Sequence, residues 1–229
     1  ANMSQRQALS QIEAQEDALG VSLSDEQRQA AIDALLEGVC VITGGPGTGK
    51  TTSINVIIRL MRRWGKVELC APTGRAAKRM SEATGEEAKT IHRLLEYGGD
   101  SETFARSQDY PLECDCLIVD EMSMVDVVLM RGLLRAITPG TRLILVGDAD
   151  QLPSVGAGNV LGDMLRSAAI PTVALREIFR QAQQSAIIRT AHAVNLGQAP
   201  CLEANQRDFF FLCRRTPERL VQTVVELVK

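Results

Sequence analysis

The sequence of 229 residues contains no long hydrophobic run. Its apolar stretches are short, as at 39–42 and 143–146, and none approaches the ~18 apolar residues that are needed to span a bilayer. The N-terminal residues, Ala1 to Gln5, form no apolar signal region either. We therefore expect neither a membrane-spanning segment nor secretion, and we expect the protein to be cytoplasmic.

Basic residues are too few to make the whole surface positive. The formal net charge is −3 at pH 7, which excludes a protein that binds nucleic acid through its overall charge. A local basic groove is still compatible with this composition. Hydrophobic residues make up 45% of the chain and charged residues 23%, so intrinsic disorder and collagen-like repeats are excluded as well.

The sequence also lacks a CxxC pair. Cysteines occur at positions 40, 70, 114, 116, 201 and 213, and four of them fall within apolar, strand-like runs. Such cysteines are typically buried, and thiols in the cytoplasm are typically reduced. Cys114 and Cys116 could ligate a metal only with partners that the sequence does not offer nearby. We expect buried, reduced thiols.

Short apolar runs alternate with helical stretches along most of the chain. Strands are predicted at 38–43, 66–71, 116–120, 142–147 and 172–175. The helices predicted around them span 49–64, 75–83, 124–137, 158–168 and 183–196. Strands that are apolar throughout and separated by helices predict a parallel sheet with helices on both faces, joined by right-handed crossovers. The predicted fold class is therefore α/β.

Two helices are predicted ahead of the first strand. Residues 4–20 form a polar, amphipathic pattern that ends at a glycine, and we interpret it as a packing or linker helix over 1–20. The second helix begins with a capping box at Ser24, in which Gln27 lies three residues further on. The main domain is accordingly expected over 21–175.

Two later segments depart from the alternation. The segment 97–112 is rich in Gly, Asp, Ser and Pro and predicts an inserted loop or a small hairpin. Residues 208–212 predict a strand, and a helix follows over 216–229, starting with Thr-Pro-Glu. Because the sequence stops within an α/β pattern, we interpret 176–229 as the truncated start of a second domain.

A phosphate-binding motif follows the first predicted strand. Gly44–Thr51 fits the pattern G-x-x-x-x-G-K-[ST] in full and opens a predicted helix, whose N–H groups and dipole favour anions. Lys50 is expected to reach the β- and γ-phosphates of ATP, and the Thr51 hydroxyl is expected to hold Mg²⁺. The fold class is thus that of a P-loop NTPase. The predicted nucleotide-binding residues are Gly45, Pro46, Gly47, Thr48, Gly49, Lys50, Thr51 and Thr52.

Two carboxylates, Asp120 and Glu121, end the predicted strand at 116–120. Ligand sites in open α/β sheets lie at the carboxyl edge of the strands. A single Asp-Glu pair is usually a solvated strand end, but the phosphate-binding motif favours a catalytic role here. Asp120 is expected to hold Mg²⁺ together with Thr51, and Glu121 to orient or deprotonate the attacking water.

A polar turn at 147–153 follows the predicted strand 142–147. An amide directed at the γ-phosphate could sense whether this group is present, and Gln151 is the candidate. A turn without a function explains Gly-Asp-Ala-Asp equally well when the segment is considered alone.

Six motifs follow one another in a fixed order: Gly44–Thr51, Ala71–Met80, Thr90–Leu95, Val119–Met124, Val146–Gly156 and Ile178–Gln181. Together they resemble the RecD-like group of superfamily 1 DNA helicases, which includes the RecD subunit of exodeoxyribonuclease V. The resemblance covers about 23–200. It implies a RecA-like sheet and ATP-driven movement along single-stranded DNA in the 5′ to 3′ direction.

The resemblance also implies roles for single residues. It assigns Gln27 to adenine recognition and Gln151 to the coupling of the γ-phosphate to DNA. Arg180 matches an arginine that reaches the γ-phosphate from the start of the second RecA-like domain. The segment 97–112 lies where such helicases carry a strand-separating, pin-like hairpin. The expected catalytic residues are thus Lys50, Asp120, Glu121, Gln151 and Arg180.

The candidate DNA-binding residues come from two of these motifs: Thr73, Gly74, Arg75, Lys78, Thr90 and His92. In the first motif, N–H groups at a helix start suit phosphate, and Arg75, Lys78 and Arg79 add positive charge. A basic helix considered alone is usually a solvated face, and His92 could equally serve the core or a cap. Aromatic residues are only 3% of the chain, so backbone contacts should dominate and binding should depend strongly on salt.

The later motifs of the second RecA-like domain, including its second arginine finger, do not appear before Lys229. We therefore expect this chain to bind nucleotide, to hydrolyse it slowly and to unwind nothing. The expected partners are single-stranded DNA and, in the full protein, other subunits of a nuclease–helicase complex. An alternative is a P-loop ATPase that switches conformation on a protein partner without moving on DNA.

Overall fold

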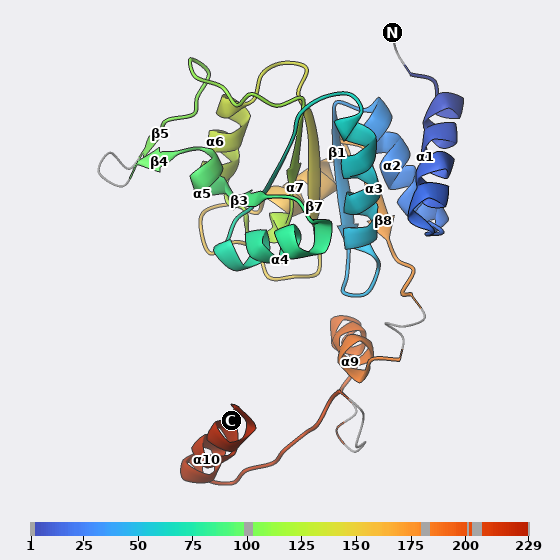
Figure 1. The fold of residues 1–229 in the computed structure, drawn as a ribbon. Coiled ribbons are helices and arrows are strands. Elements are labelled where there is room, and N and C mark those ends of the chain that lie inside the picture. The colour runs from blue at the N-terminus through green and yellow to red at the C-terminus, as the bar shows by residue number, and fades with distance from the viewer. Residues whose placement is uncertain (1–2, 99–102, 180–183, 201, 203–207, 229) are drawn as a thin grey trace. The chain divides into compact units, whose positions relative to one another are not determined.

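The structure is a computed structural model that describes residues 3–98, 103–179, 184–200, 202 and 208–228 (Figure 1). The chain divides into two compact units, Ala1–Phe179 and Arg180–Lys229. The sequence analysis expected the division after residue 175. Each unit is described by itself below.

The first unit is built on a six-stranded parallel sheet in the order β3-β2-β6-β7-β1-β8. The strands are β1 (Val39–Gly44), β2 (Val67–Ala71), β3 (Ala88–Thr90), β6 (Cys116–Val119), β7 (Arg142–Gly147) and β8 (Thr172–Leu175). The five predicted strands are confirmed. The sequence analysis missed β3, since this edge strand is short, half-buried and without an apolar run.

Helices cover both faces of the sheet (Figure 1), as the continuous burial of strands such as 116–119 requires, because successive side chains point to opposite faces. Cys40 and Ile42 of β1 join the cluster that contains α1 (Gln5–Leu19), α2 (Asp25–Leu36) and α3 (Lys50–Arg62). Val41, between them, joins the opposite cluster with α5 (Ile91–Leu94), α6 (Val127–Ala136) and α7 (Val160–Ser167). α4 (Gly74–Thr84) follows β2 at its carboxyl end, and η1 (Met122–Met124) follows β6. The predicted α/β class is confirmed.

The expected linker helix packs within the first unit as α1. Ser4 and Gln7 form a capping box at its start, and Gly20 ends it in the left-handed conformation. The helix contacts α2 and α3 and buries Ala8, Ile12 and Glu16. Residues 4–19 are therefore part of the nucleotide-binding fold.

The expected hairpin lies in the insertion. β4 (Tyr97–Gly98) and β5 (Thr103–Phe104) form an antiparallel pair, and residues 99–102 between them lie outside the described residues. The Phe104 ring packs on α6 where Gly132 leaves room, because a Cβ at Gly132 would approach the ring to 2.8 Å. The insertion is thereby anchored to the body of the sheet.

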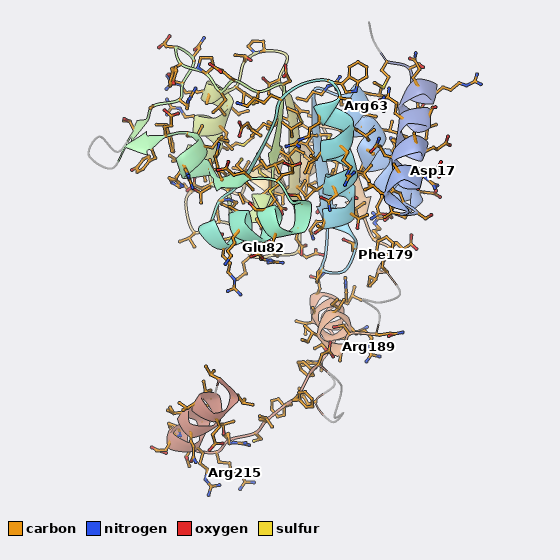
Figure 2. All side chains as sticks on the ribbon, in the orientation of Figure 1. Asp17, Arg63, Glu82, Phe179, Arg189 and Arg215 are labelled. Carbon is orange, nitrogen blue, oxygen red and sulfur yellow. The ribbon has the colours of Figure 1, made fainter. Side chains whose placement is uncertain are left out.

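The second unit contains α9 (Ala186–Asn195) and α10 (Pro217–Val228), which confirm the helices predicted there. The prediction of a strand at 208–212 was wrong, because these residues carry no regular structure. A strand is stabilised by pairing, and an apolar run such as Phe209–Leu212 remains irregular without a neighbouring strand. α10 has no buried residue, and its apolar side chains are exposed (Figure 2).

Three of the cysteines, Cys40, Cys70 and Cys116, are buried free thiols. Burial raises the pKa of the Cys40 and Cys116 thiols to about 12, so they remain protonated and unreactive near neutral pH. Cys114 is half-buried, and Cys213 is exposed, contrary to the expectation of burial. Cys201 lies outside the described residues. Among the helices that are described, none has the length and apolar character needed to cross a membrane.

Candidate nucleotide and nucleic-acid site

The loop between β1 and α3 has the geometry of a phosphate-binding loop. Gly47 and Gly49 adopt φ of 80° and 79°, which side-chain-bearing residues rarely adopt, and they fold the backbone back toward the start of α3. The Thr48 hydroxyl donates to the Gly45 carbonyl at 2.9 Å and closes the turn. The first N–H groups of α3 have no intrahelical partner and carry a positive partial charge. The loop can therefore receive an anion.

Lys50 begins α3 and turns its ammonium group back toward this loop. The Nζ atom donates to the carbonyl oxygens of Gly44 and, at 3.1 Å, of Gly45. Thr51 follows on the same turn. A cation and a hydroxyl therefore flank the loop at the positions expected from the sequence.

The acidic pair lies at the same edge of the sheet, directly after β6. The pKa of both the Asp120 and the Glu121 carboxyl is raised, chiefly by burial. The nearby Lys50 and Arg79 cations offset part of this rise. The Glu121 N–H donates to Asp120 Oδ1 at 2.8 Å, and Glu121 has φ of 55°, a sharp bend that starts η1. The structure thus brings both carboxylates into the electrostatic range of Lys50.

A small pocket joins these groups, because Thr51, Arg79, Asp120 and Glu121 all line it. No cluster of three or more His, Cys, Asp or Glu side chains suited to a metal occurs in the described part of the chain. Mg²⁺, however, is commonly held by one or two carboxylates and otherwise by waters and substrate phosphates. A hydroxyl and a carboxylate beside a phosphate loop fit that coordination.

Gln151 connects the turn after β7 to η1, which directly follows the acidic pair. Its Oε1 accepts from the Ser123 hydroxyl at 3.4 Å, and its Nε2 donates to Asp148 Oδ2 at 3.4 Å. Asp148 itself is buried and accepts from the Asp150 N–H. Through Ser123, Gln151 therefore contacts η1, the short helix that begins directly after Glu121.

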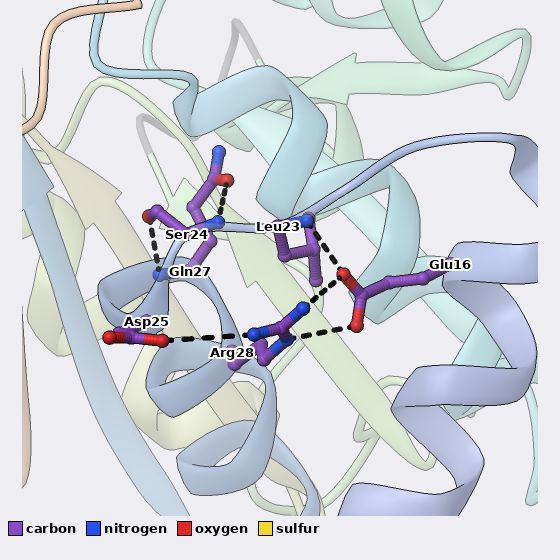
Figure 3. A network of polar contacts seen from close by, with 6 residues as sticks. All are labelled: Glu16, Leu23, Ser24, Asp25, Gln27 and Arg28. Carbon is purple, nitrogen blue, oxygen red and sulfur yellow. Dashed lines mark hydrogen bonds and ion pairs between the residues drawn. The ribbon is translucent and has the colours of Figure 1, made fainter.

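Gln27 is fully buried, and both ends of its amide are bonded inside the protein; Figure 3 shows the contacts with Ser24. Its Oε1 accepts from the Ser24 N–H at 2.9 Å in the predicted capping box, and its Nε2 donates to the Gly49 carbonyl at 3.1 Å. The side chain thus ties the start of α2 to the phosphate loop. Recognition of adenine by Gln27 stays a prediction.

Glu16 of α1 fastens the same end of α2 (Figure 3). It accepts from the Leu23 N–H at 2.7 Å and from Arg28 Nε and Nη2, each at 3.0 Å. The hydrogen bonds from Arg28 lower the pKa of the Glu16 carboxyl, although burial opposes them. A chain of contacts therefore runs from α1 through α2 to the phosphate loop.

Replacing Glu16 with glutamine should destabilise the first unit. The change removes the charge that pairs with the partly exposed Arg28, so we expect the melting temperature to fall by roughly 2–4 °C. The pKa of Glu16 is lowered in the folded protein, so its contribution is present above the ordinary pKa of 4.5 and disappears as the pH falls through the lowered value.

Thermal unfolding of wild type and Glu16→Gln between pH 7 and acid pH measures this difference. The matched control is Asp17→Asn, which changes an exposed carboxyl on the same helix (Figure 2). A stability difference that does not shrink as the pH falls would contradict the assignment.

The candidate DNA-binding residues lie at the ends of two neighbouring strands. Thr73 caps α4 by accepting from the Ala76 N–H at 3.2 Å, and Thr90 caps α5 by accepting from the Arg93 N–H at 3.1 Å. Thr73 follows β2 and Thr90 ends β3, and because these strands are parallel both residues share the carboxyl edge with the phosphate loop. The exposed residues Gly74, Arg75 and Lys78 stand on the first turns of α4.

His92 is exposed and belongs to an aromatic cluster. Its ring lies 5.4 Å from the ring of Tyr97 and 5.9 Å from that of Phe104, measured between centroids. His92 therefore helps to anchor the hairpin, and its contact with DNA stays a prediction.

One candidate lies outside the described residues. Two residues of the site were not foreseen, and a third, Arg79, was expected only to add positive charge on the DNA side. Arg180 lies outside the described residues, although its neighbour Phe179 donates from its N–H to the Gly47 carbonyl at 3.2 Å. Asp148 and Ser123 join the site around Gln151, and Arg79 joins the pocket. Asp148 follows an apolar strand just as Asp120 does, which is the signal that could have identified it.

Comparisons with known proteins agree with this geometry. Residues 27–157 match the family described as AAA domain. The chain is similar to the ATP-dependent RecD2 DNA helicase of Deinococcus radiodurans, with 45% identity over 179 residues, covering 78% of this chain and 24% of that protein. It is also similar to the RecBCD enzyme subunit RecD of Mycobacterium tuberculosis, with 42% identity over 175 residues, covering 66% of this chain and 30% of that protein.

Among solved structures, the Pif1 helicase from Candida albicans shares the fold with a TM-score of 0.57 and 27% identity. The match covers 79% of this chain and 45% of that one. The chain thus spans between 24% and 30% of the two curated relatives, so the activities of those whole proteins extend beyond what this chain contains.

Proposed function

This chain belongs to the AAA domain family and resembles, within it, the RecD-like DNA helicases, and we propose that its first unit is the first motor domain of an ATP-dependent DNA helicase. The motor binds and hydrolyses ATP with Mg²⁺ and moves on single-stranded DNA. The direction of movement is 5′ to 3′, and the process in which the motor acts is DNA recombination or repair.

A single observation carries this proposal, namely the convergence of two sets of residues on one edge of the sheet. Lys50, Thr51 and the acidic pair 120–121 lie there together. The basic start of α4 and the Thr90 cap lie at the same edge. A nucleotide and a polyanionic strand bound at one edge are near enough for each to affect the other.

Each residue of the nucleotide site has a role that its position supports. Lys50 and the N–H groups of 45–49 bind the phosphates, while Thr51 and Asp120 would hold Mg²⁺, which supplies neutralisation of charge on the transferred phosphoryl group. Glu121 orients the attacking water and accepts its proton. Gln151 couples the γ-phosphate to DNA. Arg180 lies outside the described residues, and its contact with the γ-phosphate is proposed from the resemblance alone.

The wider assembly is proposed from the relatives. RecD is named as a subunit of the RecBCD enzyme, so a nuclease–helicase complex is the proposed setting for the protein that carries this chain. The pin-like role of the β4–β5 hairpin belongs to the same proposal. Buried reduced thiols such as Cys40 are consistent with a cytoplasmic location.

Binding of single-stranded DNA in the presence of a non-hydrolysable ATP analogue tests the proposal. Fluorescence anisotropy with an oligothymidylate should show binding, and the logarithm of the association constant should fall linearly with the logarithm of the salt concentration. The double substitution of Arg75 and Lys78 by alanine should reduce this slope by about 1.4, since each phosphate contact on a single strand contributes about 0.7.

The control is Arg63→Ala, because Arg63 ends α3 far from the phosphate loop (Figure 2). It should leave the slope unchanged. Nucleotide binding without any DNA binding would favour the alternative, an ATPase that switches conformation on a protein partner. An unchanged slope in the double variant would remove Arg75 and Lys78 from the DNA path.

A further inference from the structure

The Arg79 side chain has no ion-pair or hydrogen-bond partner in the part of the chain that the structure describes, although it lies beside two half-buried carboxylates. It lines the pocket that Thr51, Asp120 and Glu121 also line, from the opposite helix, α4. Its charge lowers the pKa of both carboxyls, against the effect of burial. The guanidinium group therefore interacts electrostatically with both carboxylates but forms no ion pair or hydrogen bond with either.

The other cations of α4 are placed differently. Lys78 has a partner on its own helix, because its Nζ lies 3.8 Å from Glu82. Arg75 stands one turn before Arg79, and residues four apart lie on the same helix face, about 5–6 Å apart at Cβ. A strip of two arginines thus leads from the proposed DNA-binding start of α4 to the nucleotide pocket.

The same helix is also braced against the nucleotide-binding helix. Asn55 of α3 donates from its Nδ2 to the Ala83 carbonyl near the end of α4, at 3.1 Å. Ile54 of α3 and Met80 of α4 are buried walls of the pocket. These contacts hold the backbone of α4 against α3. The Arg79 side chain is therefore the part that can move when the charge in the pocket changes.

We infer that Arg79 is a positioning residue that couples nucleotide binding to single-stranded DNA binding, an inference that rests on the proposed function. With the site empty of nucleotide, Arg79 is drawn toward Asp120 and Glu121. A metal-bound triphosphate adds net negative charge to this pocket, so Arg79 is attracted to the pocket more strongly and its guanidinium becomes less available to a DNA phosphate beside Arg75. Such a differential interaction is what a coupling free energy requires.

The test measures the DNA affinity of the whole chain with and without a saturating non-hydrolysable ATP analogue and Mg²⁺. Coupling between sites is typically about 5- to 150-fold, so the analogue should weaken oligothymidylate binding at least about fivefold in the unmodified chain. In Arg79→Ala, the ratio between the DNA affinities measured with and without the analogue should be about one. Arg79→Lys, which keeps the charge, should restore most of the coupling.

Lys78→Ala is the matched control, because it removes a cation of the same helix that does not line the pocket. It should weaken DNA binding equally in both nucleotide states and leave the ratio unchanged. Thermal unfolding and nucleotide affinity of the Arg79 variants establish that they are folded and loaded.

The outcomes separate the two claims. If the unmodified chain binds no single-stranded DNA in either state, the proposed function is overturned and this inference with it. If it binds DNA but the ratio is near one, or if Arg79→Ala keeps the full ratio, only the inference about Arg79 is overturned.

Discussion

Replacing Glu121 with glutamine should lower the rate of ATP hydrolysis by about 10²–10⁴-fold while leaving the affinity for ATP nearly unchanged. Glutamine preserves the size of the side chain and its hydrogen-bonding capacity, but its amide does not accept a proton from water. The left-handed backbone at Glu121 directs the chain sharply after β6, and the carboxyl lines the pocket with Thr51. The loss should therefore fall on the chemical step.

Single-turnover hydrolysis with protein in excess is the suitable measurement, because this chain alone is expected to turn over slowly. Nucleotide affinity is measured in parallel with a fluorescent ATP analogue. Glu113→Gln provides the control, since Glu113 is an exposed carboxyl on the segment before β6. A Glu121→Gln variant that hydrolyses ATP at the wild-type rate would assign the base to another group.

Replacing Lys50 with alanine should weaken ATP binding by about 10- to 100-fold. Hydrogen bonds to a charged group contribute about 1.5–3 kcal/mol, and each 1.4 kcal/mol changes affinity tenfold. The Lys50 ammonium already lies against the loop, bonded to the Gly44 and Gly45 carbonyls, so it needs little movement to meet a phosphate. Titration with a fluorescent ATP analogue measures the change.

Arg59→Ala is the matched control for Lys50. Arg59 is an exposed cation on the same helix, two turns from the phosphate loop. Its removal should alter ATP affinity less than twofold. Wild-type affinity in Lys50→Ala would remove the loop from nucleotide binding, and with it the central observation of the proposed function.

Local patterns in the sequence predicted most of the fold correctly. Fully apolar strands such as 143–146 have to be buried on both faces, which leaves few alternatives to a covered parallel sheet. The capping box at Ser24 forms as predicted because it depends only on residues three apart. The phosphate loop is equally local, since its glycines and Lys50 form one continuous segment.

Features that depend on distant contacts were not predictable in the same way. β3 exists because β2 offers it a free edge, and its residues, 88–90, carry little strand signal. The apolar segment 209–212 has strong strand propensity and yet stays irregular. Strand formation depends on a neighbour that a single sequence segment does not specify.

The same limit applies to the site. A basic run at 75–79 predicts a positive helix surface, but which cation faces the carboxylates depends on how α4 packs against α3. Likewise, the capping box predicts that Gln27 accepts from Ser24, whereas its second bond, to Gly49, spans 22 residues and follows only from tertiary packing.

The docking of α1 has a consequence for how the protein is divided for study. The block of sequence matched to the AAA domain family, 27–157, begins inside α2 and ends before β8. A fragment cut to that block would expose the β1 edge that β8 covers and would leave Arg28 without Glu16. The autonomous folding unit is therefore larger than the shared sequence block, and a minimal fragment has to start before residue 4 and extend past Leu175.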